Sequence, residues 1–259
     1  MNPNLQPVFF TDLDDTLFQT KRKMQDELNM TAATAAALDR SLLPRSFMSE
    51  EQTNFVNWLF EHADVIPVTA RGTEEIGRVQ LPFSSWRVTT HGAVILNVDG
   101  SVNADWQSRI LADIAPYYDR LITLQKEIEN RMAQCDLNAW VRINYEYGDV
   151  PIYFVMKHRD STKIDELYHF ADEIEAELGT EGFYIHRNSN NIAWIPLPIE
   201  KGHAVRWLIE HLRKERGYFP IIGMGDSLSD YSFMKLCTWF AMPQKSQFTE
   251  AINHKIFGE

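Results

Sequence analysis

Two aspartates, Asp12 and Asp14, directly follow an apolar run near the start of the chain, in the segment VFFTDLDDTLF. Side chains two residues apart in an extended chain point to the same side, so the two carboxylates face one way and repel each other. Such a pair is stable when a cation lies between the carboxylates or when one of them holds a proton, and both arrangements occur in catalysis. The alternative is a solvated turn in which Asp15 and Thr16 are ordinary turn residues.

Two later segments repeat the pattern of an apolar run that ends in polar side chains. ADVIPVTAR ends in Thr69 and Arg71, and YFPIIGMGDSLSD ends in Asp226 and Asp230. In an open α/β sheet the carboxyl ends of parallel strands meet at one edge, where ligands bind. Oxygen ligands without His or Cys suit a hard cation, so these strand ends predict a site for Mg²⁺.

The predicted residue types are those that phosphoryl transfer needs. A phosphate dianion is repelled by carboxylates, so its approach requires both the metal and a fixed cation such as Lys201. We expect Asp12 to attack phosphorus and form an aspartyl phosphate. We expect Asp14 to protonate the leaving oxygen and then to deprotonate the attacking water.

The elements that would position these residues form a parallel sheet with helices. The spacing of Ser49 and Gln52 predicts a capping box at the start of a helix that ends near His62. Residues 73–80 are predicted to be helical, and residues 88–100 to form a strand and then a hairpin. Residues 31–48 fit either a helix or a hairpin.

The middle of the chain has a different pattern, from which we expect an inserted domain. The pattern of residues 101–196 predicts a helix, two strands, a second helix and two more strands. The first of these helices is expected to be interrupted at Pro116. The predicted fold class is α/β, a Rossmann-like, doubly wound parallel sheet with an inserted α+β cap domain. The discontinuous core would comprise residues 1–100 and 197–259.

The composition excludes several kinds of partner. A formal net charge of −11 disfavours nucleic acids and anionic membranes. Two cysteines are too few for a disulfide framework, the first residues lack the pattern of a signal peptide, and no apolar run is long enough to span a membrane. We therefore expect a cytoplasmic protein whose partner is a small molecule.

Four segments together resemble the haloacid dehalogenase superfamily of phosphatases. DLDDTL, VIPVTAR, Lys201 and GMGDSLSD occur in the order of that family's four motifs. The place of the insertion makes the chain similar to the Cof-like and sucrose-phosphatase-like branch. The resemblance implies that Thr69 and Lys201 bind the substrate phosphate. It also implies a metal site at the side chains of Asp12 and Asp226, the backbone carbonyl of Asp14, and Asp230.

Residues that select the substrate are less clearly marked. Many members of the family have Asn where this chain has Ser229 and His91. Candidate substrate contacts are Arg71, His91, Arg187 and Asn188. A structural histidine and a simple turn are the alternatives for His91 and for the 187–190 region, respectively.

The predicted function is a Mg²⁺-dependent phosphatase of small phosphorylated metabolites, with sugar or polyol phosphates as the expected substrates. A phosphosugar mutase or phosphotransferase would use the same aspartyl phosphate but pass the phosphoryl group to a sugar hydroxyl. A third alternative is a non-catalytic regulatory or binding protein with the same fold.

Overall fold

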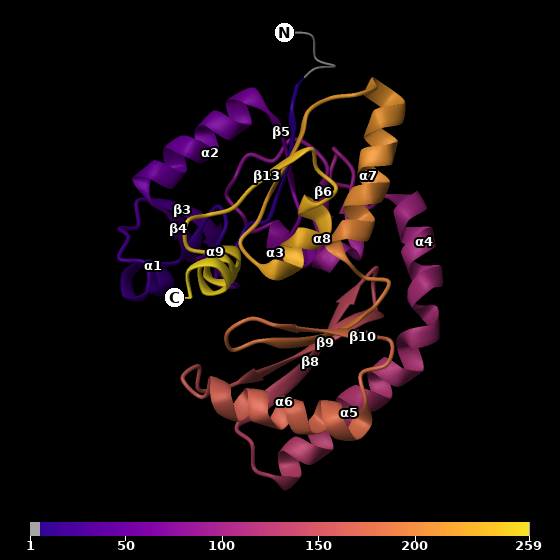
Figure 1. The fold of residues 1–259 in the computed structure, drawn as a ribbon. Helices are drawn as coiled ribbons and strands as arrows, with labels where there is room; N and C mark the ends of the chain where they lie inside the picture. The colour runs from indigo at the N-terminus through magenta and orange to yellow at the C-terminus, as the bar shows by residue number, and fades with distance from the viewer. Residues whose placement is uncertain (1–5, 259) are drawn as a thin grey trace. The chain divides into compact units, whose positions relative to one another are not determined.

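The computed structural model describes residues 6–258 of the chain and divides into two compact units. The first unit consists of Met1–Gln107 and Glu200–Glu259, and the second of Ser108–Ile199. The sequence-based bounds of the inserted segment, 101 and 196, fall near these positions. Figure 1 shows the order of helices and strands along the chain.

A parallel four-stranded sheet forms the centre of the first unit. Its order is β13 (Trp239–Ala241), β12 (Ile221–Met224), β1 (Val8–Thr11), β5 (Asp64–Pro67). In β1, Phe10 is fully buried and pairs with Gly223 on one side and Ile66 on the other. Because β1 has a neighbour on each side, its carboxyl end lies where loops from both directions of the sheet converge.

Two longer helices belong to this unit, α2 (Glu50–His62) and α7 (Lys201–Arg216), and they lie on opposite sides of the sheet (Figure 1). The predicted capping box is confirmed, since Gln52 N donates to Ser49 Oγ at 3.2 Å and Ser49 N donates to Gln52 Oε1 at 2.9 Å. The helix ends at His62, as predicted. The shorter helices are α1 (Lys21–Asp26), α3 (Thr73–Ile76), α8 (Tyr231–Met234) and α9 (Gln247–Ile252).

Residues 31–48 form a hairpin. The sequence pattern of this segment was compatible with either a helix or a hairpin. Strands β3 (Thr34–Leu38) and β4 (Pro44–Met48) pair antiparallel, and β2 (Gln19–Thr20) extends the small sheet beside β4. The hairpin also explains why the helix predicted over residues 73–80 stops at Ile76. Beyond it, Gln80 N donates to Ala36 O at 2.7 Å, so the chain leaves the helix to pair with β3.

Residues 88–100, predicted to form a strand and then a hairpin, contain an additional break after the first strand. Strands β6 (Arg87–Thr89) and β7 (Val94–Leu96) pair antiparallel around a short 3-10 turn, Thr90–Gly92. Thr90, His91 and Gly92 all have positive φ angles, of 53°, 56° and 98°. A turn with this backbone carries no hydrophobic pattern, so the sequence did not predict the break at residues 90–92. The turn predicted near residues 99–100 is present, since Asn97 N donates to Ser101 O at 2.8 Å and Gly100 N donates to Asn97 O at 2.9 Å.

The second unit contains an antiparallel sheet in the order β10 (Phe183–Arg187), β11 (Ile192–Pro196), β9 (Val150–His158), β8 (Ala139–Glu146). Helices α5 (Tyr118–Gln134) and α6 (Ile164–Leu178) pack against it, in a core that includes Phe154 and Trp194 stacked at 5.0 Å. Helix α4 (Ala104–Ile114) precedes α5, and the 3-10 turn Ala115–Tyr117 interrupts the pair at Pro116, as predicted. The predicted fold class, a parallel α/β sheet with an inserted α+β cap, is confirmed.

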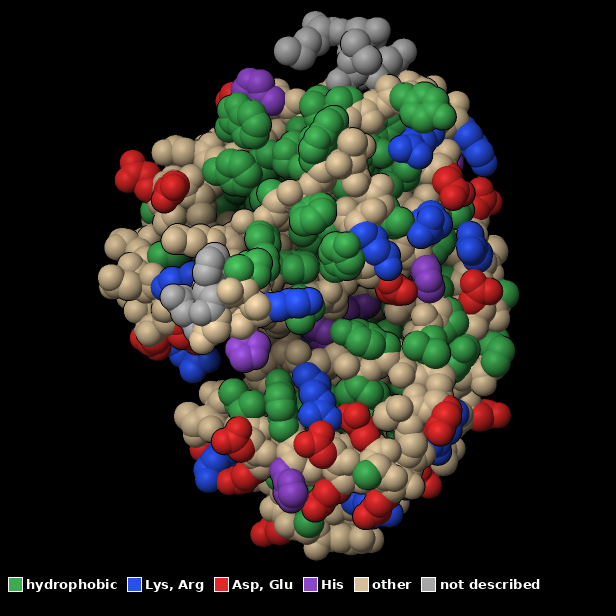
Figure 2. All heavy atoms as spheres, in the orientation of Figure 1, with side chains coloured by type: hydrophobic (Ala, Val, Ile, Leu, Met, Phe, Trp, Pro, Cys, Tyr) green, Lys and Arg blue, Asp and Glu red, His purple; other side chains and the backbone are tan. Residues whose placement is uncertain are grey.

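The edge of the parallel sheet is exposed at β13. Trp239 and Phe240 are 59% and 53% exposed, and Tyr231 of α8 packs on Phe240 with ring centroids 6.2 Å apart. Figure 2 shows hydrophobic side chains gathered over this region. Within residues 6–258, none of the helices combines the length and the hydrophobicity that a membrane span requires.

Candidate active site

Asp12 and Lys201 meet at the carboxyl end of β1. The backbone N–H of Asp12 donates to Met224 O at 2.8 Å, a contact that continues the pairing of β1 with β12. Lys201 is the first residue of α7, and its Nζ donates to Asp12 Oδ1 at 2.7 Å and to Asp230 Oδ1 at 2.6 Å. All three side chains are buried. Residues 189 positions apart in sequence thus form one charged cluster.

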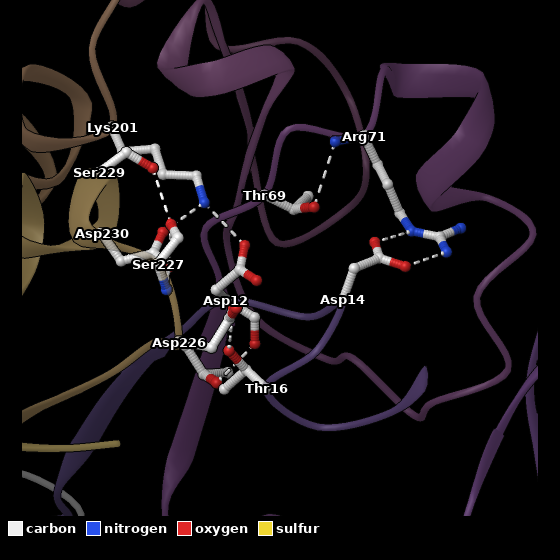
Figure 3. A network of polar contacts seen from close by, with 11 residues as sticks. Asp12, Asp14, Thr16, Thr69, Arg71, Lys201, Asp226, Ser227, Ser229 and Asp230 are labelled. Carbon is white, nitrogen blue, oxygen red and sulfur yellow. Dashed lines mark hydrogen bonds and ion pairs between the residues drawn. The ribbon is translucent and has the colours of Figure 1, made fainter. Parts of the chain in front are cut away.

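Asp12, Asp226 and Asp230 form a buried acidic triad. Each can offer one carboxylate oxygen, and these oxygens all lie within 4.8 Å of one another. Hydroxyl groups hold two of the acids in place: Thr16 Oγ1 donates to Asp226 Oδ1 at 3.1 Å, and Ser227 Oγ donates to Asp230 Oδ2 at 2.8 Å (Figure 3). Gly225 is required beside the triad, since a Cβ there would lie 2.5 Å from Asp230 Cβ.

The electrostatics of the triad favour a bound cation. Burial, together with Asp230 and Asp226, raises the pKa of Asp12 despite the opposing effect of Lys201. Burial and the neighbouring Asp230 and Asp15 carboxylates raise the pKa of Asp226 to about 7. Burial alone would lower the pKa of Lys201, but Asp12 and Asp230 outweigh it and raise that pKa. One lysine does not neutralise three carboxylates, and a hard divalent cation bound by their oxygens would hold them ionised.

Asp14 lies outside this triad and pairs with Arg71. Arg71 Nε donates to Asp14 Oδ2 at 2.7 Å and Nη2 donates to Oδ1 at 2.8 Å, a bidentate ion pair that Figure 3 shows pointing away from Lys201. Burial would lower the pKa of Arg71, but the bonded Asp14 carboxylate raises it. The guanidinium also lies over the Phe18 ring, 5.3 Å from its centroid. Arg71, which the sequence offered as a substrate contact, is therefore engaged with the second aspartate. The metal role implied for the Asp14 backbone carbonyl stays a prediction.

Thr69 lies just beyond β5 and is almost fully buried. Its Oγ1 accepts a hydrogen bond from Arg71 N at 3.1 Å, which leaves its own hydroxyl proton free to be donated. His91 N donates to Thr69 O at 3.1 Å, so the Thr90–Gly92 turn packs beside the end of β5. A Cβ at Gly92 would lie 2.6 Å from Glu200 O, next to Lys201. This turn therefore contacts the segments that carry both predicted phosphate-binding residues.

Arg187 and Asn188 belong to the second unit, and both form hydrogen bonds with other residues of that unit. Arg187 Nη2 donates to Asp172 Oδ1 at 2.6 Å and to Glu175 Oε1 at 2.5 Å, which ties β10 to α6. Asn188 N donates to Asn191 O at 2.9 Å and closes the turn before β11. The turn that was the alternative for this region is therefore present, and Arg187 has a structural ion pair.

The sequence reasoning missed the hydroxyl residues around the triad. Thr16 was considered only as a turn residue in the alternative interpretation and had no role in the predicted site, yet it is buried and hydrogen-bonded to Asp226. Ser227 binds Asp230 through both its backbone N–H, at 3.0 Å, and its hydroxyl, and it also pairs with Ser229 at 2.7 Å. Their positions inside the two acidic motifs were a usable signal, because clustered buried carboxylates need hydrogen-bond donors.

No protein-family profile matches the chain, and no curated protein matches it in sequence. Solved structures do match it. A protein of Thermoplasma acidophilum has a TM-score of 0.58 at 14% identity, with 96% of this chain and 89% of the other covered. The C-terminal domain of the Candida albicans trehalose-6-phosphate phosphatase has a TM-score of 0.55 at 15% identity, covering 98% and 77%. The Plasmodium falciparum IMP-nucleotidase has a TM-score of 0.56 at 10% identity, covering 99% and 69%.

At these identities the likeness establishes the fold. The chain shares the fold of these solved structures, two of which are named as a phosphatase and a nucleotidase. The fold alone does not assign a reaction, which depends on the geometry of the site.

Proposed function

We propose that the protein is a Mg²⁺-dependent phosphoric monoester hydrolase of small phosphorylated metabolites, with sugar or polyol phosphates as its substrates. One observation carries the proposal: the buried Asp12 lies in contact with Lys201 and within an acidic triad that could hold a divalent cation. A nucleophilic carboxylate, a fixed positive charge and a metal site are together what attack on a phosphate dianion requires.

In the proposed reaction, a carboxylate oxygen of Asp12 attacks phosphorus and the bond from phosphorus to the leaving oxygen breaks. Asp14 donates a proton to that oxygen and the alcohol departs. Asp14 then takes a proton from water, whose oxygen attacks the aspartyl phosphate and releases inorganic phosphate and free Asp12. Lys201 and the Thr69 hydroxyl bind the phosphoryl oxygens throughout. When bound at the triad, Mg²⁺ would neutralise charge on the phosphate and on the carboxylates.

Two observations support the proposed substrate class. One structural neighbour is named for trehalose 6-phosphate and another for a nucleotide, IMP. The chain's net charge of −11 disfavours polyanionic nucleic acids, which leaves small phosphomonoesters. Product analysis separates hydrolysis from phosphoryl transfer, since a mutase would release an isomerised sugar phosphate instead of free phosphate.

The first test is the Asp12→Asn variant, assayed with p-nitrophenyl phosphate and magnesium. We expect hydrolysis to fall by about 10⁴-fold or more, because an amide does not replace the nucleophile. Asp15→Asn is the matched control from the same motif and should retain most activity, since Asp15 forms an ion pair with Lys23 and Asn also tolerates its φ of 65°. Full magnesium-dependent activity in Asp12→Asn would refute the mechanism.

The metal site has its own test. Addition of Mg²⁺ to chelator-treated protein should raise the melting temperature, because the ion binds only the folded triad. Asp226→Asn should lose most of this increase, and the control Asp99→Asn, in an exposed turn, should keep it. An equal increase in all three proteins would show that magnesium binds elsewhere.

A further inference from the structure

A cavity lies within the first unit, and no residue of the acidic triad lines it. Its volume is about 320 Å³, at the lower end of the range for small-molecule sites. Its walls come from α3, from the segment after α3 and from the β6–β7 hairpin. They present both polar and apolar atoms, and the apolar side chains include Ile76, Val79, Leu81 and Leu96. All four side chains are largely buried.

One cation lies in the wall of this cavity. Arg87 lines the cavity, and its Nη2 donates to the backbone oxygen of Phe83 at 2.8 Å. A Cβ at Gly100, which also lines the cavity, would lie 3.6 Å from Arg87 Nη1. The guanidinium therefore extends between the backbone at residues 83 and 100, on the cavity side.

Arg87 differs from other partly buried arginines of the same unit. Arg71, Arg78 and Arg216 each form an ion pair with a carboxylate. Within residues 6–258, no carboxylate oxygen lies within 4.0 Å of an Arg87 nitrogen, although the chain has 36 acidic residues against 25 basic ones. A partly desolvated guanidinium with spare N–H donors is stabilised by an anion that completes its hydrogen bonds.

We propose that this cavity is a binding site for a small amphiphilic carboxylate, separate from the phosphatase site. The carboxylate pairs with Arg87 and the hydrocarbon body packs against Ile76, Val79, Leu81 and Leu96. The positive charge of Arg87 favours an anion. The four apolar side chains favour a ligand with a short aliphatic or aromatic body over a free inorganic ion.

The experiment uses sodium octanoate as the probe and 1-octanol as its uncharged analogue, with binding measured by isothermal titration calorimetry on the full chain. We expect saturable octanoate binding to the wild type. Arg87→Gln should bind octanoate about tenfold or more weakly, since it loses the charge, while octanol binding changes little. Arg87→Lys should recover most of the octanoate affinity, and Arg206→Gln, at an exposed position on α7, should match the wild type.

Filling the cavity provides an independent variant. Val79→Phe should abolish binding of both probes while circular dichroism and the melting temperature show a folded protein. The proposal is overturned if the wild type shows no saturable octanoate binding, if Arg87→Gln binds it unchanged, or if folded Val79→Phe still binds it. Repeating the titrations with Asp12→Asn protein separates this site from the phosphatase activity, because binding there requires no catalysis.

Discussion

At the scale of single residues, the two acids of the first motif have different surroundings. Asp12 is buried against Lys201, whereas the side chain of Asp14 is 47% exposed and bound in a bidentate pair by Arg71. A bidentate pair fixes the plane of a carboxylate as well as its position. Arg71 therefore orients the group that we propose as the acid and base.

The Arg71–Asp14 pair predicts a specific kinetic signature. Arg71→Ala should lower kcat by about ten- to a hundredfold with little change in KM, because an untethered Asp14 spends less time in the productive orientation. Arg71→Lys should recover only part of the loss, since lysine cannot form the two parallel hydrogen bonds.

Asp14→Asn provides the reference for this effect and should lower kcat by about 10²- to 10⁴-fold. If Arg71 acts through Asp14, the double variant should be no slower than Asp14→Asn alone. A raised KM with unchanged kcat in Arg71→Ala would instead make Arg71 the substrate contact that the sequence analysis expected.

At the scale of elements, the Thr90–Gly92 turn joins the two halves of the site. On one side, the backbone N–H of His91 in this turn donates to Thr69 O. On the other side, the turn lies against Glu200, next to Lys201. Gly92 is required there for two reasons: its φ is 98°, and an added Cβ would lie only 2.6 Å from Glu200 O.

Gly92→Ala should therefore destabilise the protein by about 2 kcal/mol or more, through backbone strain and the displaced Glu200 segment. Gly148→Ala is the matched control, because Gly148 has a φ of 88° but no atom lies within 4 Å of an added Cβ. It should cost about 1 kcal/mol. Urea denaturation of both variants measures the difference, and equal costs would show that the contact with Glu200 is unimportant.

The sequence predicts most elements of this fold where their signals are local. The capping box at Ser49 and Gln52 and the interruption at Pro116 depend on nearby residues, and both are present. The Ala-rich segment 34–38 is a strand because it pairs with β4 and with residues after α3, which no local propensity encodes. In the site, strand order brings Asp12 and Asp226 together, but the partners of Asp14 and Arg187 depend on side-chain directions that only the folded structure defines.

At the scale of the whole molecule, the net charge of −11 acts on every approaching phosphate. Salt screens this long-range repulsion, whereas it would screen the proposed contact of the phosphate with the buried Lys201 much less. We predict that kcat/KM for a phosphomonoester rises by about twofold or more between about 10 and 150 mM NaCl at constant free Mg²⁺. The value of kcat should stay constant and serves as the internal control, and a fall in kcat/KM would mean that local positive charge dominates the encounter.

The pairing of β1 with β12 has a consequence for the order in which the protein forms. Asp12 is synthesised early, whereas its neighbours Lys201 and Asp226 are synthesised only after the whole of the second unit. Until then β1 lacks one of its two neighbouring strands, and Asp12, the proposed nucleophile, lacks the positive charge of Lys201. The proposed catalytic centre would therefore be completed late in synthesis, and we expect a nascent chain that ends within the second unit to have no phosphatase activity.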